Sequence, residues 1–370
     1  MRVAKHRPTV ATVDLATIRH NVDALRKHLG AGPEIWAVVK ADAYGHGAVR
    51  VARAVSSLVN GYCVSNLDEA LELREGQIDK PILVLSGIAP RDAALARAFD
   101  ITLTAANLDW LTEVAALGKA VSGLKIHIKV DSGMGRIGVR TADEVAKMIA
   151  TIDAASLDFD GIFTHFATAD EENSEKYQQQ VTAFAEIVDH LPRRPRYVHS
   201  TNSAAALWHK EQVQDIERFG IAMYGLNPSG ETLELPFELE PALSLTSELT
   251  MVKKLSAGDS VGYGADFVAA EDTVVGTLPI GYADGWTRSM TGFHVLVDGE
   301  FCEIIGRVSM DQTTIKLAKA YPLGTKVTLI GTDGDKIISA QEVADYRGTI
   351  SYEVLCGLTD RIVRDYINEQ

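Results

Sequence analysis

The sequence is poor in cysteine and has no long apolar run. Its three cysteines, Cys63, Cys302 and Cys356, are odd in number and widely separated, which argues against a disulfide framework or a zinc knuckle. We interpret all three as small hydrophobic residues and assign no metal site. No segment could span a bilayer, and the opening residues MRVAKHRPTVATVDL lack the apolar core of a signal peptide. We therefore expect a cytoplasmic protein without membrane partners.

Basic residues are also scarce. The chain has 36 Lys and Arg against 50 Asp and Glu, a net charge of -14, which argues against nucleic acid as a partner. With 46% hydrophobic and 23% charged residues it has an ordinary globular composition. At 370 residues it exceeds what one core usually serves, so we expect two domains. A small-molecule enzyme is the default function.

Short β-branched runs alternate with longer amphipathic stretches from about residue 34 to about residue 225. This pattern predicts eight strand-helix units, the number in a (β/α)8 TIM-type barrel, although periodicity alone leaves an open doubly wound sheet possible. The predicted strands are 34–39, 61–65, 81–86, 100–104, 124–130, 159–164, 196–200 and 217–223.

The pattern of hydrophobic and polar residues changes after about residue 240. Alternating segments such as FHVLVDG and KVTLIG are separated by glycine turns, which predicts a mainly antiparallel β domain. We therefore expect a barrel domain over residues 1–240 and a β domain over residues 241–370. A further strand near residues 9–15 precedes the barrel pattern and could pair with either domain.

Polar residues follow the predicted barrel strands, where parallel barrels place their active sites. Any one of them alone is more simply explained as a helix cap or turn, but together they favour a site. They are Lys40, Ser65, Asn66, Lys129, Asp131, His165, His199, Ser200 to Ser203, and Arg218.

Lys40 is the most distinctive of these residues. A lysine in a barrel mouth can be desolvated, lose its proton near neutral pH and form a Schiff base with an aldehyde such as pyridoxal phosphate. Its phosphate would lie by the last strands, where Ser203, Gly220 and Ile221 are available. The alternative is a solvated surface lysine.

In a pyridoxal phosphate site, Arg218 would affect the protonation of the pyridine nitrogen. Most such enzymes place a carboxylate beside the pyridine nitrogen to keep it protonated. An arginine cannot accept that proton, so side reactions such as transamination would be suppressed. The alternative is a surface arginine paired with Glu217 or Asp215. In the β domain, Tyr263 lies in a polar glycine loop and acquires a role only if it reaches a barrel mouth.

At these residues the chain resembles the alanine racemase family, over nearly its whole length. The motifs occur in the family's order: AVVKADAYGHG, KVDSGMGRIG, FTHFATAD, STNSAA, RFGIAMYGLNP, VGYGADF, LPIGYADG, GRVSMDQ and SYEVLCGL. The resemblance implies a (β/α)8 barrel with a C-terminal β domain, pyridoxal 5'-phosphate as cofactor, and supply of D-alanine for bacterial peptidoglycan.

The resemblance also implies a two-base mechanism in a homodimer with shared active sites. Lys40 would remove the α-hydrogen of D-alanine and Tyr263, contributed by the partner subunit, that of L-alanine. His165 and Arg218 would support the ring nitrogen. The remaining roles are cofactor binding by Tyr44, Ser203, Gly220, Ile221 and Tyr352; substrate carboxylate binding by Arg136 and Met310; a gate of Tyr282, Asp311 and Tyr352; and orientation of Arg136 by a carbamylated Lys129.

Several alternatives share parts of this pattern. A vitamin B6-binding regulatory protein has a similar barrel and lysine but no second domain. A basic amino-acid decarboxylase of the same fold type has a glutamate where this chain has Arg218. Within the racemases, a broad-specificity or serine racemase remains an alternative substrate assignment.

Overall fold

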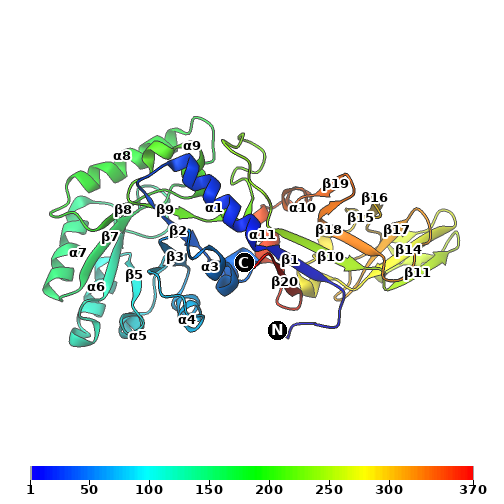
Figure 1. Cartoon of the computed structure of the whole chain (residues 1–370), viewed down its shortest axis with the longest axis horizontal. Helices are drawn as coiled ribbons and strands as arrows, with labels where there is room; N and C mark the ends of the chain where they lie inside the picture. Colours follow the sequence, from blue (N-terminus) through cyan, green and yellow to red (C-terminus); the bar gives the residue numbers. More distant parts are fainter. Residues whose placement is uncertain (1, 370) are drawn as a thin grey trace. The chain divides into compact units, whose positions relative to one another are not determined.

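The computed structural model describes residues 2–369, which divide into two compact units. One unit comprises Thr17–Ala43 and Gly47–Glu240. The other comprises residues 2–16, Tyr44–His46 and residues 241–369. The first unit contains the alternating strands and helices, and the second contains the remaining described strands (Figure 1).

The first unit is built on eight parallel strands in the order β8-β7-β6-β5-β4-β3-β2-β9. β2 also pairs with β9, and a parallel bridge between Asn202 and Arg218 nearly closes the ring. The strands are β2 (Glu34–Val38), β3 (Gly61–Val64), β4 (Ile82–Val84), β5 (Ile101–Ala105), β6 (Lys125–Lys129), β7 (Asp158–Phe163), β8 (Tyr197–His199) and β9 (Ile216–Phe219). The predicted barrel is therefore confirmed, and the alternative of an open doubly wound sheet is wrong.

The last predicted strand was too long. β9 ends at Phe219, and Ile221–Tyr224 form a 3-10 helix instead. Apolar residues continue without a break through this segment, so its composition does not mark the change from strand to helix. Gly220, with φ -111° and ψ -109°, lies between the two elements.

Helices follow the strands and cover the outside of the barrel (Figure 1). Several begin after a residue whose side-chain oxygen accepts from a backbone N-H of the first turn: Asn66, Asn107, Thr141, Ser174 and Asn202. The helices are α1 (Leu15–Leu29), α2 (Lys40–Gly45), α3 (Ala48–Val55), α4 (Leu67–Glu75), α5 (Ala93–Ala98), α6 (Leu108–Ala115), α7 (Ala142–Ala154), α8 (Glu175–Asp189) and α9 (Ser203–Trp208).

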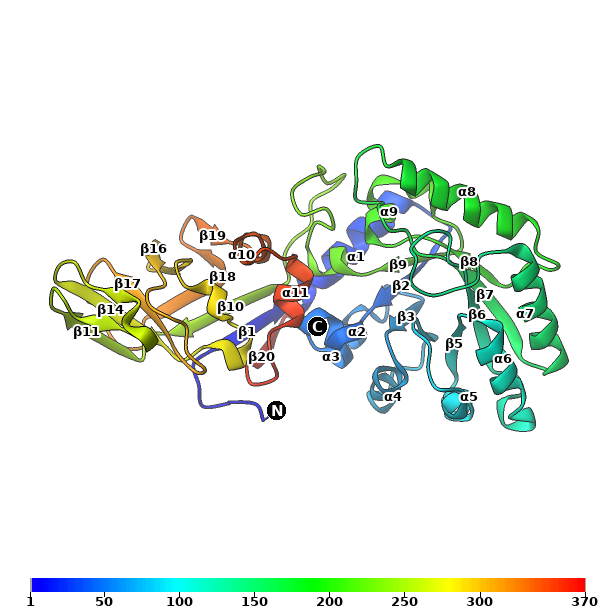
Figure 2. The same cartoon turned by 180° about the vertical axis from the view of Figure 1, so that it is seen from behind.

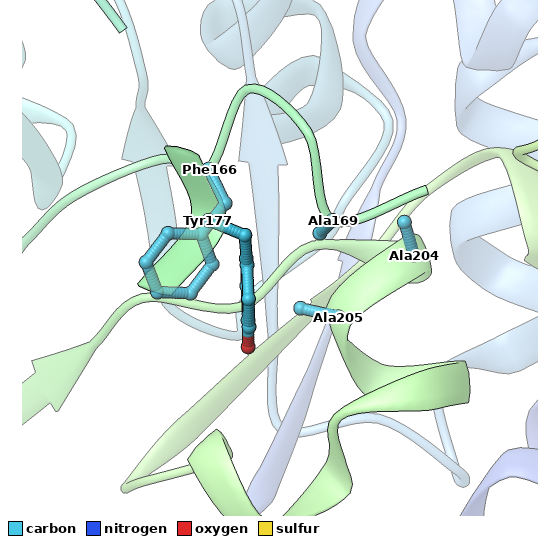
Figure 3. Packing of buried hydrophobic residues seen from close by; sticks show 5 residues of the cluster. All are labelled: Phe166, Ala169, Tyr177, Ala204 and Ala205. Carbon is cyan, nitrogen blue, oxygen red and sulfur yellow. The ribbon is translucent and has the colours of Figure 1, made fainter. Parts of the chain in front are cut away.

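A buried cluster fastens α8 and α9 to the loop after β7 (Figure 3). The Phe166 and Tyr177 rings meet edge to face, with centroids 4.9 Å apart. Ala169 and the α9 residues Ala204 and Ala205 complete the cluster. This packing stabilises the two segments that carry His165 and Ser203 by removing apolar surface from water.

Inside the barrel, aromatic and polar side chains meet. The rings of Trp36 on β2 and His127 on β6 have centroids 6.3 Å apart, although three strands separate β2 from β6 around the sheet. Both side chains must therefore point inward. His127 lies directly against the backbone of Gly161 on β7, its register partner.

The second unit is mainly antiparallel, as predicted (Figure 2). Its largest sheet has the order β16-β15-β18-β10-β1-β20, with β19 paired to β18; the other sheets are β11-β14-β17 and β12-β13. β1 pairs with β10 and β20, so the early strand joins this unit rather than the barrel.

The bounds of this unit's elements follow. The strands are β1 (Val10–Asp14), β10 (Leu243–Glu248), β11 (Met251–Leu255), β12 (Ser260–Val261), β13 (Phe267–Val268), β14 (Thr273–Leu278), β15 (His294–Val297), β16 (Glu300–Glu303), β17 (Thr313–Leu317), β18 (Lys326–Asp333), β19 (Lys336–Ile338) and β20 (Val363–Ile367). Two helices that the sequence pattern did not reveal, α10 (Ala340–Arg347) and α11 (Ser351–Cys356), precede β20.

One cysteine differs from its expected environment. Cys63 and Cys302 are buried, as is usual for small hydrophobic residues, whereas Cys356 is exposed at the end of α11. Within residues 2–369, no helix has both the length and the apolar character needed to cross a membrane.

Gly161→Ala should destabilise the barrel. A Cβ at Gly161 would lie 2.5 Å from Cε1 of His127, inside van der Waals contact, and such overpacking costs about 1–3 kcal/mol. Denaturant unfolding measures this loss. Gly87→Ala is the matched control, because a Cβ there meets nothing within 4 Å; equal stability of the two variants would contradict the packing argument.

Candidate active site

Polar side chains gather at the carboxyl ends of the barrel strands, as the sequence predicted. Burial, followed by the charges of Arg218, Arg136, Lys129 and Lys40, holds the pKa of His165 well below its usual value. Basic side chains from separate strands and loops therefore act electrostatically on the partly buried imidazole of His165. Such a site attracts anions and keeps His165 neutral.

Lys40 is half-buried at the start of α2, two residues after β2 ends. The turn that begins there is left-handed. The four residues after Lys40 have φ of 52°, 51°, 53° and 55° at Ala41, Asp42, Ala43 and Tyr44. Left-handed geometry costs a non-glycine residue roughly 1–2 kcal/mol, so the surrounding structure must hold this segment in place.

Two carboxylates hold the left-handed turn. Glu69 on α4 accepts from the backbone N-H of Ala41 at 2.9 Å and from that of Ser65 at 2.6 Å, which joins the ends of β2 and β3. Asp42 Oδ1 accepts from the N-H of Ala48 at 2.7 Å. The backbone next to Lys40 is therefore fixed by charge-assisted hydrogen bonds.

The end of the same turn is packed in the second unit. Tyr44 is buried, and its ring centroid lies 6.0 Å from that of Tyr352 on α11. A Cβ at Gly45 would lie 2.5 Å from the carbonyl oxygen of Leu355, so the position has no room for a side chain. Arg364 donates to the carbonyl of Gly45 at 3.2 Å. The predicted pair Tyr44 and Tyr352 is thus brought together.

Arg218 is buried rather than exposed, which excludes the surface ion pair considered above. Its guanidinium donates to Nδ1 of His199 at 2.7 Å and to the carbonyls of Thr164 and Ser200 at 3.0 Å each, and it lies 3.5 Å from Nδ1 of His165. Asp215 pairs with Arg194 instead. A permanently charged donor group is therefore fixed at the barrel end.

The segment that carries His165 is held by Gln180 of α8. Its side chain accepts from the N-H of Ala167 at 2.8 Å and donates to the carbonyl of His165 at 3.2 Å. Gln180 is completely buried. Sequence reasoning missed this residue, because a glutamine in an amphipathic helix is usually exposed.

Lys129 is the last residue of β6, and its amine is buried. Desolvation, together with the charges of Arg218 and Arg136, lowers the pKa of Lys129 to about 7, although Asp131 acts in the opposite direction. The amine donates to the carbonyl of Val130 at 2.6 Å. A substantial fraction of Lys129 is therefore uncharged and nucleophilic at neutral pH.

The loop that carries Arg136 is organised by Asp131. One carboxylate oxygen accepts from the N-H of Gly133 at 3.2 Å and of Gly135 at 2.8 Å, and the other accepts from Nη2 of Arg140 at 2.8 Å. Arg136 itself is exposed. The loop therefore presents a cation from a fixed backbone.

Ser203 and Gly220 lie side by side at the ends of the last two barrel strands. The backbone N-H of Gly220 donates to the hydroxyl oxygen of Ser203 at 2.9 Å. Ile221 starts the short 3-10 helix, and the first N-H groups of a helix have no partner within it. Loops after these strands and the start of a short helix commonly bind phosphate in parallel barrels.

The remaining predicted residues belong to the second unit. Tyr263 is 73% exposed on a turn between Gly262 and Gly264, both with positive φ. Tyr282 and Met310 are also exposed. A cavity of about 480 Å³ is lined by Tyr263, Tyr282, Arg288, Arg307 and Val308.

The two arginines of this cavity were missed by sequence reasoning. Arg288 lies three residues after the motif LPIGYADG, and Arg307 lies within the motif GRVSMDQ, so their positions in or near the motifs were the available signal. Arg307 forms an ion pair with Asp266, which lies three residues after Tyr263. This pair fastens the turn that presents the tyrosine.

Asp311 is held by a separate ion-pair network. Arg361 donates to Asp311 at 2.7 Å and also pairs with Asp284 at 3.2 Å. Asp284 is completely buried and accepts from Arg7 at 2.8 Å and from the N-H of Gly281 at 2.9 Å. The turn that carries Tyr282 and the residue Asp311 are thereby joined.

Comparison with known proteins gives full-length matches. Family models described as "Alanine racemase, N-terminal domain" and "Alanine racemase, C-terminal domain" match residues 13–228 and 242–366. An alanine racemase of Lactococcus lactis subsp. lactis (strain IL1403) is 62% identical over 99% of this chain and 100% of its own length.

Solved structures of racemases also match this chain over almost its whole length. The crystal structure of alanine racemase from E. faecalis matches with a TM-score of 0.97 and 44% identity over 99% of this chain and 100% of that chain. A histidine racemase from Leuconostoc mesenteroides subsp. sake matches with a TM-score of 0.93 and 34% identity over the same shares.

Proposed function

The chain belongs to the alanine racemase family, and we propose that it interconverts L-alanine and D-alanine with pyridoxal 5'-phosphate as cofactor. The observation that carries this proposal is the 62% identity to an alanine racemase over essentially the whole chain. The match of the second family model speaks against a single-domain vitamin B6-binding protein. Supply of D-alanine for peptidoglycan is the use that family membership implies.

The residues present fit the cofactor. The hydroxyl of Ser203, which accepts from the N-H of Gly220, would donate its own proton to a phosphate, next to the N-H of Ile221 and the buried Tyr44. Arg218 is a buried donor without a proton-accepting group, suited to an unprotonated ring nitrogen. Lys40 supplies the amine. When bound, the cofactor supplies electron withdrawal that makes the α-hydrogen of an attached amino acid acidic.

Racemisation needs a proton carrier on each face of the α-carbon, because one base alone would restore the starting enantiomer. We assign Nζ of Lys40 to one face, for the proton of D-alanine. The hydroxyl of Tyr263 of the partner subunit is assigned to the other face, for the proton of L-alanine. His165 and Arg218 support this arrangement by orienting the ring and keeping a donor at its nitrogen.

A homodimer with shared sites follows from this assignment. Its support is that Tyr263, Tyr282 and Met310 are all exposed on the second unit, where a monomer gains nothing from exposing large apolar side chains. In the dimer, Arg136 and the backbone amide of Met310 would bind the substrate carboxylate. Tyr282, Asp311 and Tyr352 would gate its entrance.

Substrate breadth is the second point that the family leaves open. A histidine racemase shares the fold, so a broad-specificity or serine racemase remains the alternative assignment. We favour alanine because the relative that is 62% identical is an alanine racemase, whereas the histidine racemase is only 34% identical.

The first test is racemisation by the purified protein. With pyridoxal phosphate and L-alanine it should form D-alanine, and Lys40→Ala should lose both this activity and the visible absorbance of the lysine-bound cofactor. Lys119→Ala changes an exposed lysine and is the control. Absence of D-alanine with the wild-type protein would overturn the proposed function.

Tyr263→Phe should impair the two directions unequally. Loss of the hydroxyl removes one proton carrier, which costs about 10²- to 10⁴-fold in rate. Exchange of the α-hydrogen with deuterium oxide should persist for D-alanine and be lost for L-alanine. Tyr346→Phe, which removes a hydroxyl that donates to Thr291, is the control. Equal exchange from both enantiomers would refute the two-base assignment.

Lys129 should be carbamylated. Its pKa of about 7 leaves an unprotonated amine, the form that attacks carbon dioxide, between the positive charges of Arg218 and Arg136. In ¹³C-bicarbonate, a carbamate NMR signal should increase as the pH rises through about 7. Lys129→Gln should lose the signal and Lys125→Gln, which changes a lysine paired with Asp100, should retain it. A wild-type protein without the signal above this pH would exclude the modification.

A further inference from the structure

A column of hydrogen bonds runs inside the barrel from Arg218 to a carboxylate. Arg218 lies 2.7 Å from Nδ1 of His199, Nε2 of His199 lies 2.9 Å from Nδ1 of His127, and Nε2 of His127 lies 3.0 Å from Oδ2 of Asp160. All four side chains are at least nine-tenths buried. Only Arg218 and His199 come from strand ends that the sequence singled out.

The chemistry of the end groups fixes the direction of every hydrogen bond. Arginine has no acceptor, so Nδ1 of His199 must carry a lone pair. Burial and the charge of Arg218 hold the pKa of His199 well below its usual value, so this ring is neutral and its proton is on Nε2. That proton is donated to Nδ1 of His127. A doubly protonated His127 would place two N-H groups against each other at 2.9 Å.

The carboxylate completes this order. With Nδ1 of His127 accepting, its single proton lies on Nε2 and is donated to Asp160, an acceptor-only group when ionised. If a donor stood at position 160, the order could reverse. His199 would then direct an N-H at the Arg218 guanidinium, and that hydrogen bond would be lost.

The backbone is shaped around this column. The β6–β7 register shifts so that Phe159 pairs with Ile126 and Gly161 with His127, which leaves Asp160 as the extra residue of a bulge. Bulges redirect a side chain, here toward the barrel interior. The missing Cβ of Gly161 admits the His127 ring.

Aromatic rings hold both imidazoles. The ring of Phe163 stacks on His199 at 4.8 Å with an interplanar angle of 1°. Trp36 and Tyr197 have ring centroids 6.3 and 6.1 Å from that of His127. The imidazoles therefore cannot turn over to exchange their nitrogens without displacing buried neighbours.

We propose that Asp160 and His127 are positioning residues of the active site, which fix the tautomer of His199 and through it the orientation of the Arg218 guanidinium. This inference rests on the proposed function, in which Arg218 donates to the cofactor ring nitrogen. If Asp160 and His127 only stabilised the fold, they would form the same buried hydrogen bonds. Their substitution would then lower stability without a separate effect on kcat.

The first experiment needs no variant. Neutron diffraction from deuterium-exchanged crystals of the holoenzyme should show deuterium on Nε2 and none on Nδ1 in both His127 and His199. Deuterium on Nδ1 of either ring would overturn the proposal. If the wild-type protein does not racemise alanine, the proposed function is refuted. The proton positions on His127 and His199 then test the positioning inference on their own.

The second experiment compares Asp160→Asn with Thr104→Val in the holoenzyme. Thr104 is the register partner of His127 on β5, and its buried hydroxyl donates to the carbonyl of Val84 outside the column. Asp160→Asn should lower kcat on the order of 10- to 100-fold, as loss of an orienting partner typically does, with KM little changed and an altered spectrum of the bound cofactor.

Thr104→Val should retain the wild-type kcat and spectrum even if it is less stable. A wild-type kcat and spectrum in Asp160→Asn would overturn the proposal while leaving the racemase assignment intact. Equal losses in both variants would do the same, because they would show a general effect of disturbing the barrel interior. If Asp160→Asn does not fold, the proton positions on His127 and His199 in the wild-type holoenzyme test the proposal.

Discussion

The buried guanidinium of Arg218 is the group on which the barrel end depends. An arginine stays charged even when buried, so its desolvation must be compensated by acceptors. His199, two backbone carbonyls and the column that ends at Asp160 provide them. Desolvation, and after it the same positive charge, lowers the pKa of His165 and of Lys129.

The left-handed turn after Lys40 is a second constraint, and its origin is different. Four non-glycine residues adopt a backbone conformation that is unfavourable for each of them. Glu69 and Asp42 hold the turn in the barrel unit, and Arg364 and the carbonyl of Leu355 enclose Gly45. Strain of this kind persists where the surrounding structure outweighs it, which is common at functional sites.

Much of the architecture was predictable because strands and helices have their own periodicities. The eight barrel strands were identified because parallel strands covered on both faces are continuous apolar runs. β9 was overextended and α10 and α11 were missed, since local composition does not distinguish a short buried helix from a strand. The exposed Cys356 shows that residue type alone does not determine burial.

The candidate site was predictable for a related reason. Parallel topology sends the carboxyl ends of all strands to one end, so Lys40, Lys129, His165, Ser203 and Arg218 could be grouped before any coordinates were known. Gln180, His127 and Asp160 were not found. Each lies within a regular element, and its role depends on a neighbour distant in sequence. The alternation of strand residues places His127 on the same face as Lys129, a signal that could have been used.

The sequence by itself determined most of the elements, the end of the barrel where polar side chains gather, and the family. These follow from hydrophobic periodicity, chain direction and motifs, all of which are local or ordered along the chain. Only the tertiary structure decided that Arg218 is buried, that the turn after Lys40 is left-handed, that β1 joins the second unit, and that two histidines connect Arg218 to Asp160. Those features depend on distances between residues far apart in the chain, and on desolvation, which no single segment specifies.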